Sequence, residues 1–174
     1  MLVRLWPYVP GLYGRDALYH VWNAMETDGA TRQAFWDDAY LETGGDMASF
    51  VSAFDGASTK GLLMVERLDT HALCGAFWAT NIVRGHQAIA SMWMQTAARG
   101  VRTVEAARLA LASMFDALQI QQIWSMTPWL QAGTLCQRMG FEHVAVLPDY
   151  CQWEGRLKAV HLYRLTKARF DAHN

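Results

Sequence analysis

One junction between an expected strand and an expected helix combines residue types that bind phosphate. Arg99, Gly100 and Arg102 stand directly before the clearest helical pattern of the chain, at 103–118. The first N–H groups of a helix lack intrahelical partners and carry partial positive charge. Such a terminus can hold a pyrophosphate, and nearby arginines add to the attraction. Two arginines in a loop are more often solvated than ligand-bound, so the junction by itself is a weak signal.

Few other residues offer chemistry at an informative spacing. His86 precedes an expected central strand and can act as a base, because imidazole titrates near neutral pH. A solvated loop histidine is the alternative. Six histidines and three cysteines show no zinc-binding spacing, and the chain contains neither a nucleophilic-serine elbow nor a Walker loop. We therefore expect no metal cofactor.

Composition limits the class of protein. The chain has 174 residues, of which 52% are hydrophobic and 18% charged, and this predicts one globular domain with a substantial core. A formal net charge of −1 leaves no broad basic field, which disfavours a dedicated nucleic-acid binder. The sequence has no apolar run of membrane-spanning length, no signal-peptide pattern and an odd number of cysteines. These features predict a cytoplasmic protein with free thiols and no membrane partner.

The hydrophobic periodicity predicts the elements that must position these residues. Helical spacing covers 15–25, 31–41, 103–118 and 130–139, and 47–59 suits a short helix and loop. Strand patterns cover 61–67, 72–79, 87–94, 120–126, 142–147 and 159–165. A loop is expected at 148–156. A strand meander followed by a crossover helix predicts an α/β (mixed α+β) fold, with a mixed sheet of six or seven strands flanked by about four helices.

Three stretches of the second half share residues with one family. Residues 98–107 stand where that family has Gln/Arg-x-x-Gly-x-Gly/Ala and a Thr-Glu-Ala helix start, and 135–141 are similar to its Leu-x-Glu-Lys-x-Gly-Phe. Residues 146–163 look like its ending, Leu-Arg-Asp-Tyr, then Trp-x-Gly-Arg, then Leu-Tyr, which is the most specific match. On these residues, the chain from 72 to 167 resembles the GNAT acetyltransferases, in particular the branch similar to the RimJ and RimL ribosomal-protein N-acetyltransferases.

The resemblance implies a GNAT-like acyl-CoA N-acyltransferase fold in a single domain, 1–174. Residues 1–70 would form the acceptor side and 72–167 the acetyl-CoA-binding core. The pantetheine arm of the co-substrate would lie between strands 87–94 and 120–126, and a backbone N–H near Met94 would polarise the thioester oxygen. The implied cofactor-binding residues are Met94, Gln95, Arg99, Gly100, Val101, Arg102, Thr103, Val104 and Arg138.

The cofactor loop departs from the family pattern. Ala98 replaces the family's Gln or Arg, and Val101 replaces its central Gly. A valine Cβ crowds such a loop, unless Gly100 takes over the tight position in a shifted loop.

The implied catalytic residues are altered as well. Trp129 stands where the family has Asn, and Cys136 stands where it often has the Tyr that protonates the leaving thiolate. The Cys136 thiol can donate a proton, or it can be a buried structural cysteine. Tyr150, in the matched loop, can donate to the thiolate, line the acceptor site or pack beneath its loop.

The implied function is transfer of an acetyl or short acyl group from acyl-CoA to an amine by direct attack in a ternary complex. The acceptor would be a small-molecule amine, a protein N-terminus or a modified nucleotide. The altered residues leave a second class open, a catalytically inactive GNAT-like protein with a binding or structural role. Eight Trp and nine Met suit a core of large side chains, an acceptor groove or a partner surface, and we expect a homodimer.

Overall fold

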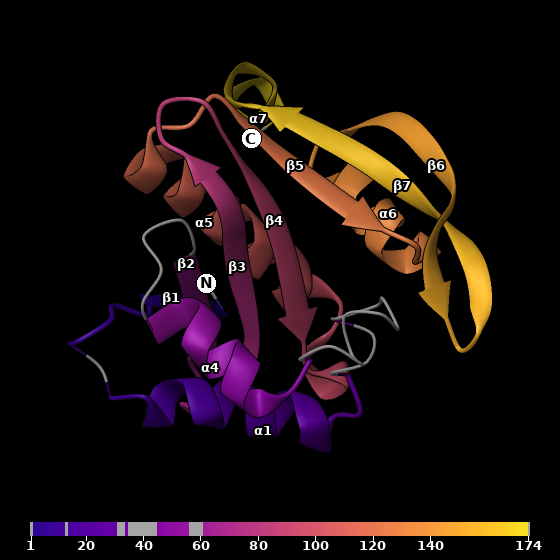
Figure 1. Cartoon of the computed structure of the whole chain (residues 1–174). Coiled ribbons are helices and arrows are strands. Elements are labelled where there is room, and N and C mark those ends of the chain that lie inside the picture. Colours follow the sequence, from indigo (N-terminus) through magenta and orange to yellow (C-terminus); the bar gives the residue numbers. More distant parts are fainter. Residues whose placement is uncertain (1, 13, 31–33, 35–44, 56–60, 174) are drawn as a thin grey trace.

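One mixed sheet of seven strands organises the protein, in the order β1-β2-β3-β4-β5-β7-β6 (Figure 1). The computed structural model describes residues 2–12, 14–30, 34, 45–55 and 61–173. The strands are β1 (Val3–Pro7), β2 (Gly61–Arg67), β3 (Leu73–Val83), β4 (Gln87–Met94), β5 (Gln122–Thr127), β6 (Glu142–Trp153) and β7 (Arg156–Thr166). The described helices are α1 (Asp16–Thr27), α4 (Met47–Asp55), α5 (Val101–Leu118), α6 (Leu130–Arg138) and α7 (Lys167–His173), with a 3-10 turn η1 (Thr96–Ala98).

Helices cover both faces of the sheet, and each face has its own apolar cluster. On one face, Ala107 and Leu111 of α5 pack with Phe77 of β3. On the other face, Trp22 of α1 and Phe50 of α4 pack in one cluster, their rings 5.5 Å apart. Alternate side chains of a strand point to opposite faces, so β3 and β4, which lie between the clusters, contribute to both.

The mixed α/β fold predicted from the sequence is confirmed. Every neighbouring pair of strands is antiparallel except β4 and β5, which are parallel and joined by α5. Residues 47–55 form the predicted short helix, begun by Asp46, whose carboxylate accepts a hydrogen bond from the Ser49 N–H (2.8 Å). The helix expected at 31–41 lies outside the described residues, apart from Ala34, which is helical.

The prediction of a loop at 148–156 is wrong. Strands β6 and β7 continue through it as one long hairpin, and the turn is only Glu154–Gly155, both with positive φ as a tight hairpin turn requires. The pairing slips between Leu147 and Cys151, and this irregularity accommodates Pro148 and the left-handed Asp149. Pro148 and the turn-forming residues made the strand pattern hard to recognise.

Two elements escaped the sequence analysis. Strand β1 is only five residues long and pairs with β2, some sixty positions later in the chain. A run this short shows no clear alternation, so the local pattern did not predict it. Helix α7 has seven residues and follows β7 directly. Its Phe170 packs on Phe115 of α5, with ring centroids 5.4 Å apart.

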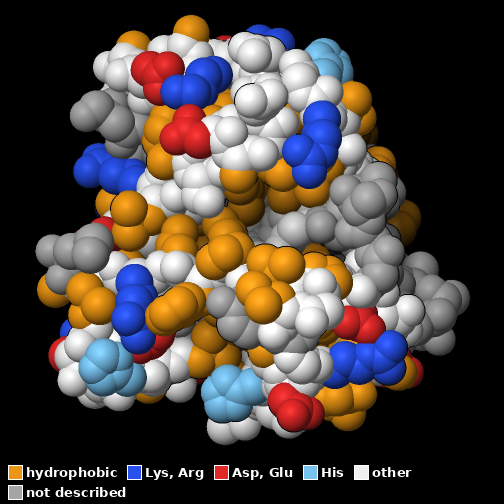
Figure 2. Space-filling model, turned by 90° about the vertical axis from the view of Figure 1, so that its left-hand side faces the viewer, with side chains coloured by type: hydrophobic (Ala, Val, Ile, Leu, Met, Phe, Trp, Pro, Cys, Tyr) orange, Lys and Arg blue, Asp and Glu red, His pale blue; other side chains and the backbone are white. Residues whose placement is uncertain are grey.

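Hydrophobic and charged side chains are unevenly spread over the surface. On the face in Figure 2, hydrophobic side chains gather across the middle, and most charged side chains lie above and below them. None of the helices in the described part of the chain combines the length and apolar character needed to cross a bilayer.

Candidate active site

The sheet opens between β4 and β5. The two strands pair in parallel only at 87–89 with 122–124, and Figure 1 shows them diverging beyond that point. Ala90 and Ser125 are therefore the first residues of a split that widens toward Met94 and Thr127. Two adjoining cavities occupy this split, an outer groove and an inner cavity.

The outer groove is the larger of the two, with a volume of about 680 Å³. Its walls are the end of β4, the first turn of α5 and the exposed side of α6. Among the predicted cofactor residues, the groove is lined by Met94, Arg99, Gly100, Thr103, Val104 and Arg138. Gln95, Val101 and Arg102 are absent from its lining.

The first turn of α5 lies at this groove, which Gly100, Thr103 and Val104 line. The helix begins at Val101, two residues before the start expected from the sequence, and Gly100 precedes it with φ 101°. The first helical hydrogen bond joins the Thr103 N–H to the Gly100 carbonyl (3.1 Å). The N–H groups of Val101 and Arg102 precede that bond, so they carry the positive end of the helix dipole.

Gly100 occupies the position of the loop where the backbone has a positive φ, a conformation that would be strained at a valine such as Val101. A φ of 101° is open to glycine and costly for other residues. Apart from its two chain neighbours, no described residue has an atom within 4 Å of the place where a Cβ on Gly100 would stand, so the backbone is open to a ligand there. The Val101 side chain is 74% exposed, so its Cβ does not crowd the protein.

The two arginines of the junction have different surroundings. Arg99 lines the outer groove, and its Nε donates a hydrogen bond to the Met94 carbonyl (3.3 Å). Arg102 instead forms an ion pair with Asp69 (3.4 Å), which also holds Arg67 at 2.6 Å. These two arginines keep the pKa of Asp69 at about 2, with the Arg67 hydrogen bond as the main cause.

A buried hydroxyl also lies at this end of α5. Thr103 lines the outer groove, and within the described residues its Oγ1 is buried without a hydrogen-bond partner. A buried hydroxyl without a partner is costly, and protein atoms cover this one although its residue lines the groove.

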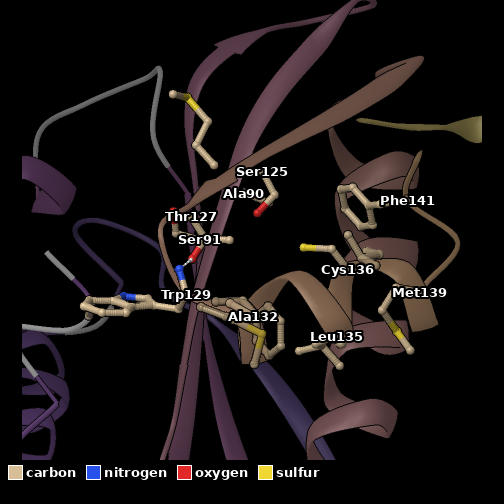
Figure 3. Close-up of a pocket in the computed structure, with 16 residues that line it drawn as sticks. Ala90, Ser91, Ser125, Thr127, Trp129, Ala132, Leu135, Cys136, Met139 and Phe141 are labelled. Carbon is tan, nitrogen blue, oxygen red and sulfur yellow. Dashed lines mark hydrogen bonds between the residues drawn. The ribbon is translucent and has the colours of Figure 1, made fainter. Parts of the chain in front are cut away.

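The inner cavity is smaller and mostly apolar, with a volume of about 120 Å³ (Figure 3). It begins at Ala90 and Ser125 and extends between the sheet and helices α5 and α6. Among the described lining residues, the polar side-chain groups are three hydroxyls, one thiol and the Trp129 indole N–H. The Thr127 hydroxyl already accepts a hydrogen bond from the backbone N–H of Trp129 (3.1 Å). The described residues that line it are Ala34, Phe77, Ala90, Ser91, Met92, Ala107, Leu111, Ser125, Met126, Thr127, Trp129, Ala132, Leu135, Cys136, Met139 and Phe141.

Of the three predicted catalytic side chains, only Cys136 lies in the split. Its sulfur points into the inner cavity from α6, toward Ser125 on β5 (Figure 3). Burial raises the pKa of the Cys136 thiol, and a hydrogen bond with Ser125 opposes part of that shift. The side chain is therefore a neutral thiol at neutral pH, which can donate a proton but is a poor nucleophile.

His86 and Tyr150 lie elsewhere. His86 is an exposed turn residue before β4, at the end of the strand where β4 and β5 still pair. Eight residues of strand separate it from Met94, which is about 26 Å at 3.3 Å per residue. Tyr150 is 54% exposed on β6, and neither residue lines the two cavities.

Sequence reasoning missed the contacts that position Trp129, which lines both cavities where they adjoin. Its ring meets Trp153 at 5.0 Å, and the Lys158 ammonium lies 4.5 Å from its centroid. Trp153 and Lys158 come from the β6–β7 hairpin, and Trp153 lies in the part of it, 148–156, that was expected to be a loop. The matched Trp-x-Gly-Arg motif was the available signal, but it did not indicate what Trp153 contacts.

Asp28 was also missed. Its carboxylate accepts hydrogen bonds from the Thr96 N–H (3.0 Å) and from the Trp93 indole (3.1 Å). These bonds join the end of α1 to the segment between β4 and α5. Asp28–Gly29 was interpreted only as a helix end, because the pattern at that point carries no information about distant partners.

Comparisons with known proteins bear on the fold. No protein-family model matches the sequence, and no curated protein matches it. Solved structures do match. A spermidine N-acetyltransferase from Vibrio cholerae, in complex with CoA and spermine, is 15% identical with a TM-score of 0.77, over 97% of this chain and 98% of that one. A probable acetyltransferase is 13% identical with a TM-score of 0.71, over 97% of this chain and 94% of that one.

A third match is a spermidine/spermine N-acetyltransferase from Vibrio cholerae in complex with manganese ions. It is 13% identical with a TM-score of 0.73, over 99% of this chain and 97% of that one. At such identities a likeness establishes the fold, and the chain has the fold of these N-acetyltransferases, as the sequence resemblance implied. The expectation that no metal takes part stays a prediction.

Proposed function

We propose that this protein transfers an acyl group from acyl-CoA to an amine. The observation that carries the proposal is the outer groove, which leads from the first turn of α5 to the split between β4 and β5. Its α5 end is lined by Arg99, Gly100 and Thr103 and lies beside the first N–H groups of the helix, a combination that suits a pyrophosphate. The fold, shared with N-acetyltransferases, agrees with this use of the groove.

In this proposal the pyrophosphate of CoA lies against Gly100 and the N–H groups of Val101 and Arg102. Arg99 and Arg138 add positive charge from the two sides of the groove. The pantetheine arm follows the groove past Met94 and brings the thioester to the split. Arg102 contributes through its backbone, because its side chain is paired with Asp69.

The reaction is direct attack on the thioester. The amine nitrogen forms a bond to the carbonyl carbon and the C–S bond breaks, so the amine loses a proton and the CoA thiolate gains one. Alignment of the two reactants supplies most of the acceleration, up to roughly 7–11 kcal/mol. The Cys136 thiol is the proposed proton donor to the thiolate and regains its proton through solvent. Replacing Cys136 with Ala should lower kcat more than it changes KM.

The proposal also covers the amine that accepts the acyl group and the branch of the family that the chain resembles. The hairpin residues Trp153–Arg156 resemble the RimJ and RimL branch, which favours a protein N-terminus. The similar structures include spermidine N-acetyltransferases, which favours a small polyamine. We propose a primary amine as the common chemistry, and parallel assays with spermidine and with short peptides distinguish the two. The cytoplasmic location and the homodimer also stay predictions.

A second candidate is a GNAT-like binding protein without catalysis. It is favoured by the aromatic Trp129 and the thiol of Cys136, which stand where the resembled family has Asn and often Tyr.

Two measurements on the full chain decide between the candidates. The first is calorimetric titration with CoA and acetyl-CoA, and the second is release of the CoA thiol in the presence of each amine. Binding with turnover supports the enzyme, and binding without turnover for any amine supports the second candidate. Absence of binding at millimolar ligand contradicts both the enzyme and its cofactor site.

A further inference from the structure

The inner cavity is a chamber without an assigned occupant. It adjoins the outer groove, with which it shares Met92, Trp129, Ala132 and Leu135. Along α5, Thr103 and Val104 line the outer groove, whereas Ala107 and Leu111 line the inner cavity. One turn of helix is 3.6 residues, so the inner cavity lies one to two turns deeper than the phosphate end of the groove.

The two cavities differ in chemistry. Arginines line the outer groove, whereas no charged side chain is among the described residues lining the inner cavity. The far wall of the inner cavity consists of the apolar side chains of Phe77, Leu111, Met139 and Phe141. A charged group would lose its hydration there without gaining an oppositely charged partner among the described residues, whereas a hydrocarbon chain would gain apolar contacts.

Small residues make the space available. Ala90 and Ala107 stand on β4 and α5 at places where a larger side chain would fill the cavity. Both are buried, and both belong to the apolar cluster on the α5 face. Protein interiors are otherwise close-packed, so a gap of this size in an apolar core is an exception that a ligand can use.

The volume sets the length of the occupant. At roughly 30 Å³ for a group the size of a water molecule, 120 Å³ holds about four such groups. An acetyl group would leave about half of that space empty. An unbranched acyl chain of about four carbons would fill it.

We propose that the inner cavity binds the hydrocarbon tail of the acyl group, so that the donor is a short-chain acyl-CoA of about four carbons in preference to acetyl-CoA. The proposal rests on the function proposed above, because the tail reaches the cavity only when the thioester lies at the split between Ala90 and Ser125. It assigns chain-length selection to Ala107 and Leu111 on α5.

The test is a titration series on the full chain with CoA and with acetyl-, butanoyl-, hexanoyl- and decanoyl-CoA. Each buried methylene should strengthen binding about fourfold. Butanoyl-CoA should therefore bind about tenfold or more tightly than acetyl-CoA. The gain should stop there, so hexanoyl-CoA should bind no more tightly than butanoyl-CoA, because a chain of about four carbons already fills the cavity.

Two substitutions locate the effect. Ala107→Leu fills the cavity and should reduce the ratio of butanoyl-CoA to acetyl-CoA affinity to near one. Leu111→Val enlarges the cavity and should move the preferred chain to a greater length. Ala117→Leu is the matched control, because Ala117 is exposed on the same helix and lines neither cavity. It should leave the whole series unchanged. Circular dichroism checks that each variant is folded.

The outcomes separate the two proposals. If CoA binds but acetyl-CoA binds as tightly as butanoyl-CoA or more so, the acyl-cavity proposal is overturned and the acyltransferase proposal stands. An affinity that rises steadily to decanoyl-CoA, and rises equally in Ala107→Leu, indicates non-specific hydrophobic binding and also overturns it. If neither CoA nor any acyl-CoA binds, both proposals fail. Should Ala107→Leu not fold, the wild-type series and Leu111→Val still decide the question.

Discussion

The indole rings of Trp129 and Trp153 meet edge to face, with centroids 5.0 Å apart and planes at 86°. Lys158 completes the group, with its ammonium 4.5 Å from the Trp129 centroid and 5.9 Å from that of Trp153. The β6–β7 hairpin thereby fixes a ring that lines both cavities. The Trp129 ring is thus one contact that links the hairpin to the site.

Loss of the Lys158 charge should loosen this link. Lys158→Met should lower the free energy of unfolding by about 0.5–1 kcal/mol, because it removes the cation–π contact but keeps most of the apolar stem. Urea denaturation followed by circular dichroism measures the change. In a Trp129→Leu background the same substitution should have almost no effect. An equal effect in both backgrounds would show that Lys158 stabilises the protein by another contact.

Reversing the charge of Arg99 should weaken CoA binding. A charge-assisted hydrogen bond contributes roughly 1.5–3 kcal/mol, so Arg99→Glu should raise the Kd for acetyl-CoA by at least about tenfold. Arg102→Glu is the comparison, because Arg102 pairs with Asp69 outside the groove lining. We expect a smaller loss of affinity for it than for Arg99→Glu. If both arginine changes leave the affinity intact, CoA binds elsewhere or not at all.

The loop before α5 gives a paired prediction. Gly100→Ala should weaken CoA binding and destabilise the protein by about 1–3 kcal/mol, because alanine at φ 101° is strained. Val101→Gly should leave the affinity for CoA unchanged or improve it, because the exposed valine side chain is replaced by a residue that permits closer approach. Calorimetric titration and thermal unfolding of both variants test the pair. A stronger loss of affinity for Val101→Gly than for Gly100→Ala would contradict this assignment.

Gly133 should tolerate no side chain. A Cβ there would lie 2.3 Å from the Tyr163 hydroxyl oxygen, so Gly133→Ala must displace either α6 or the phenol of β7. Overpacking of this kind costs typically about 1–3 kcal/mol, which thermal unfolding would reveal. Gly61→Ala is the matched control, because Ile82, at 3.9 Å, is the only described residue that its Cβ would meet. Equal stability of the two variants would show that α6 can shift freely on the sheet.

Protonation of Glu66 at low pH should weaken its ion pair with Arg4, which joins β1 to β2. Hydrogen bonds, above all from Arg4 and also from His71 and Trp6, lower the pKa of Glu66 from 4.5 to about 2. A carboxyl group with a lowered folded-state pKa stabilises the fold fully above pH 4.5, and the contribution is lost as the pH falls toward 2.

The variant Glu66→Gln tests this directly. It should be less stable than the wild type at pH 7, and the difference should shrink steadily between pH 4.5 and 2. Urea unfolding at pH 7, 4 and 3 gives the three values needed. A stability difference that does not change over this range would show that the Glu66 charge makes no contribution.

Local patterns were sufficient for the elements that carry the site. The apolar spacing at 103–118 predicted α5, and the alternation at 87–94 predicted β4. Helical and strand periods are properties of neighbouring residues, so they can be read before folding is considered. The combination of Arg99 and Gly100 before a helix likewise indicated which helix terminus would face a groove.

Contacts between distant segments were decided by the tertiary structure alone. Arg102 looked equivalent to Arg99 in the sequence, but the turn between β2 and β3 places Asp69 beside it. Trp129 and Trp153 meet because β6 and β7 continue as a hairpin over α6, although the sequence there suggested a loop. The inner cavity depends on where β4 and β5 stop pairing and on side chains from three strands and two helices. A chain pattern records the spacing of neighbours, whereas a cavity is a property of packing between segments that only the folded chain brings together.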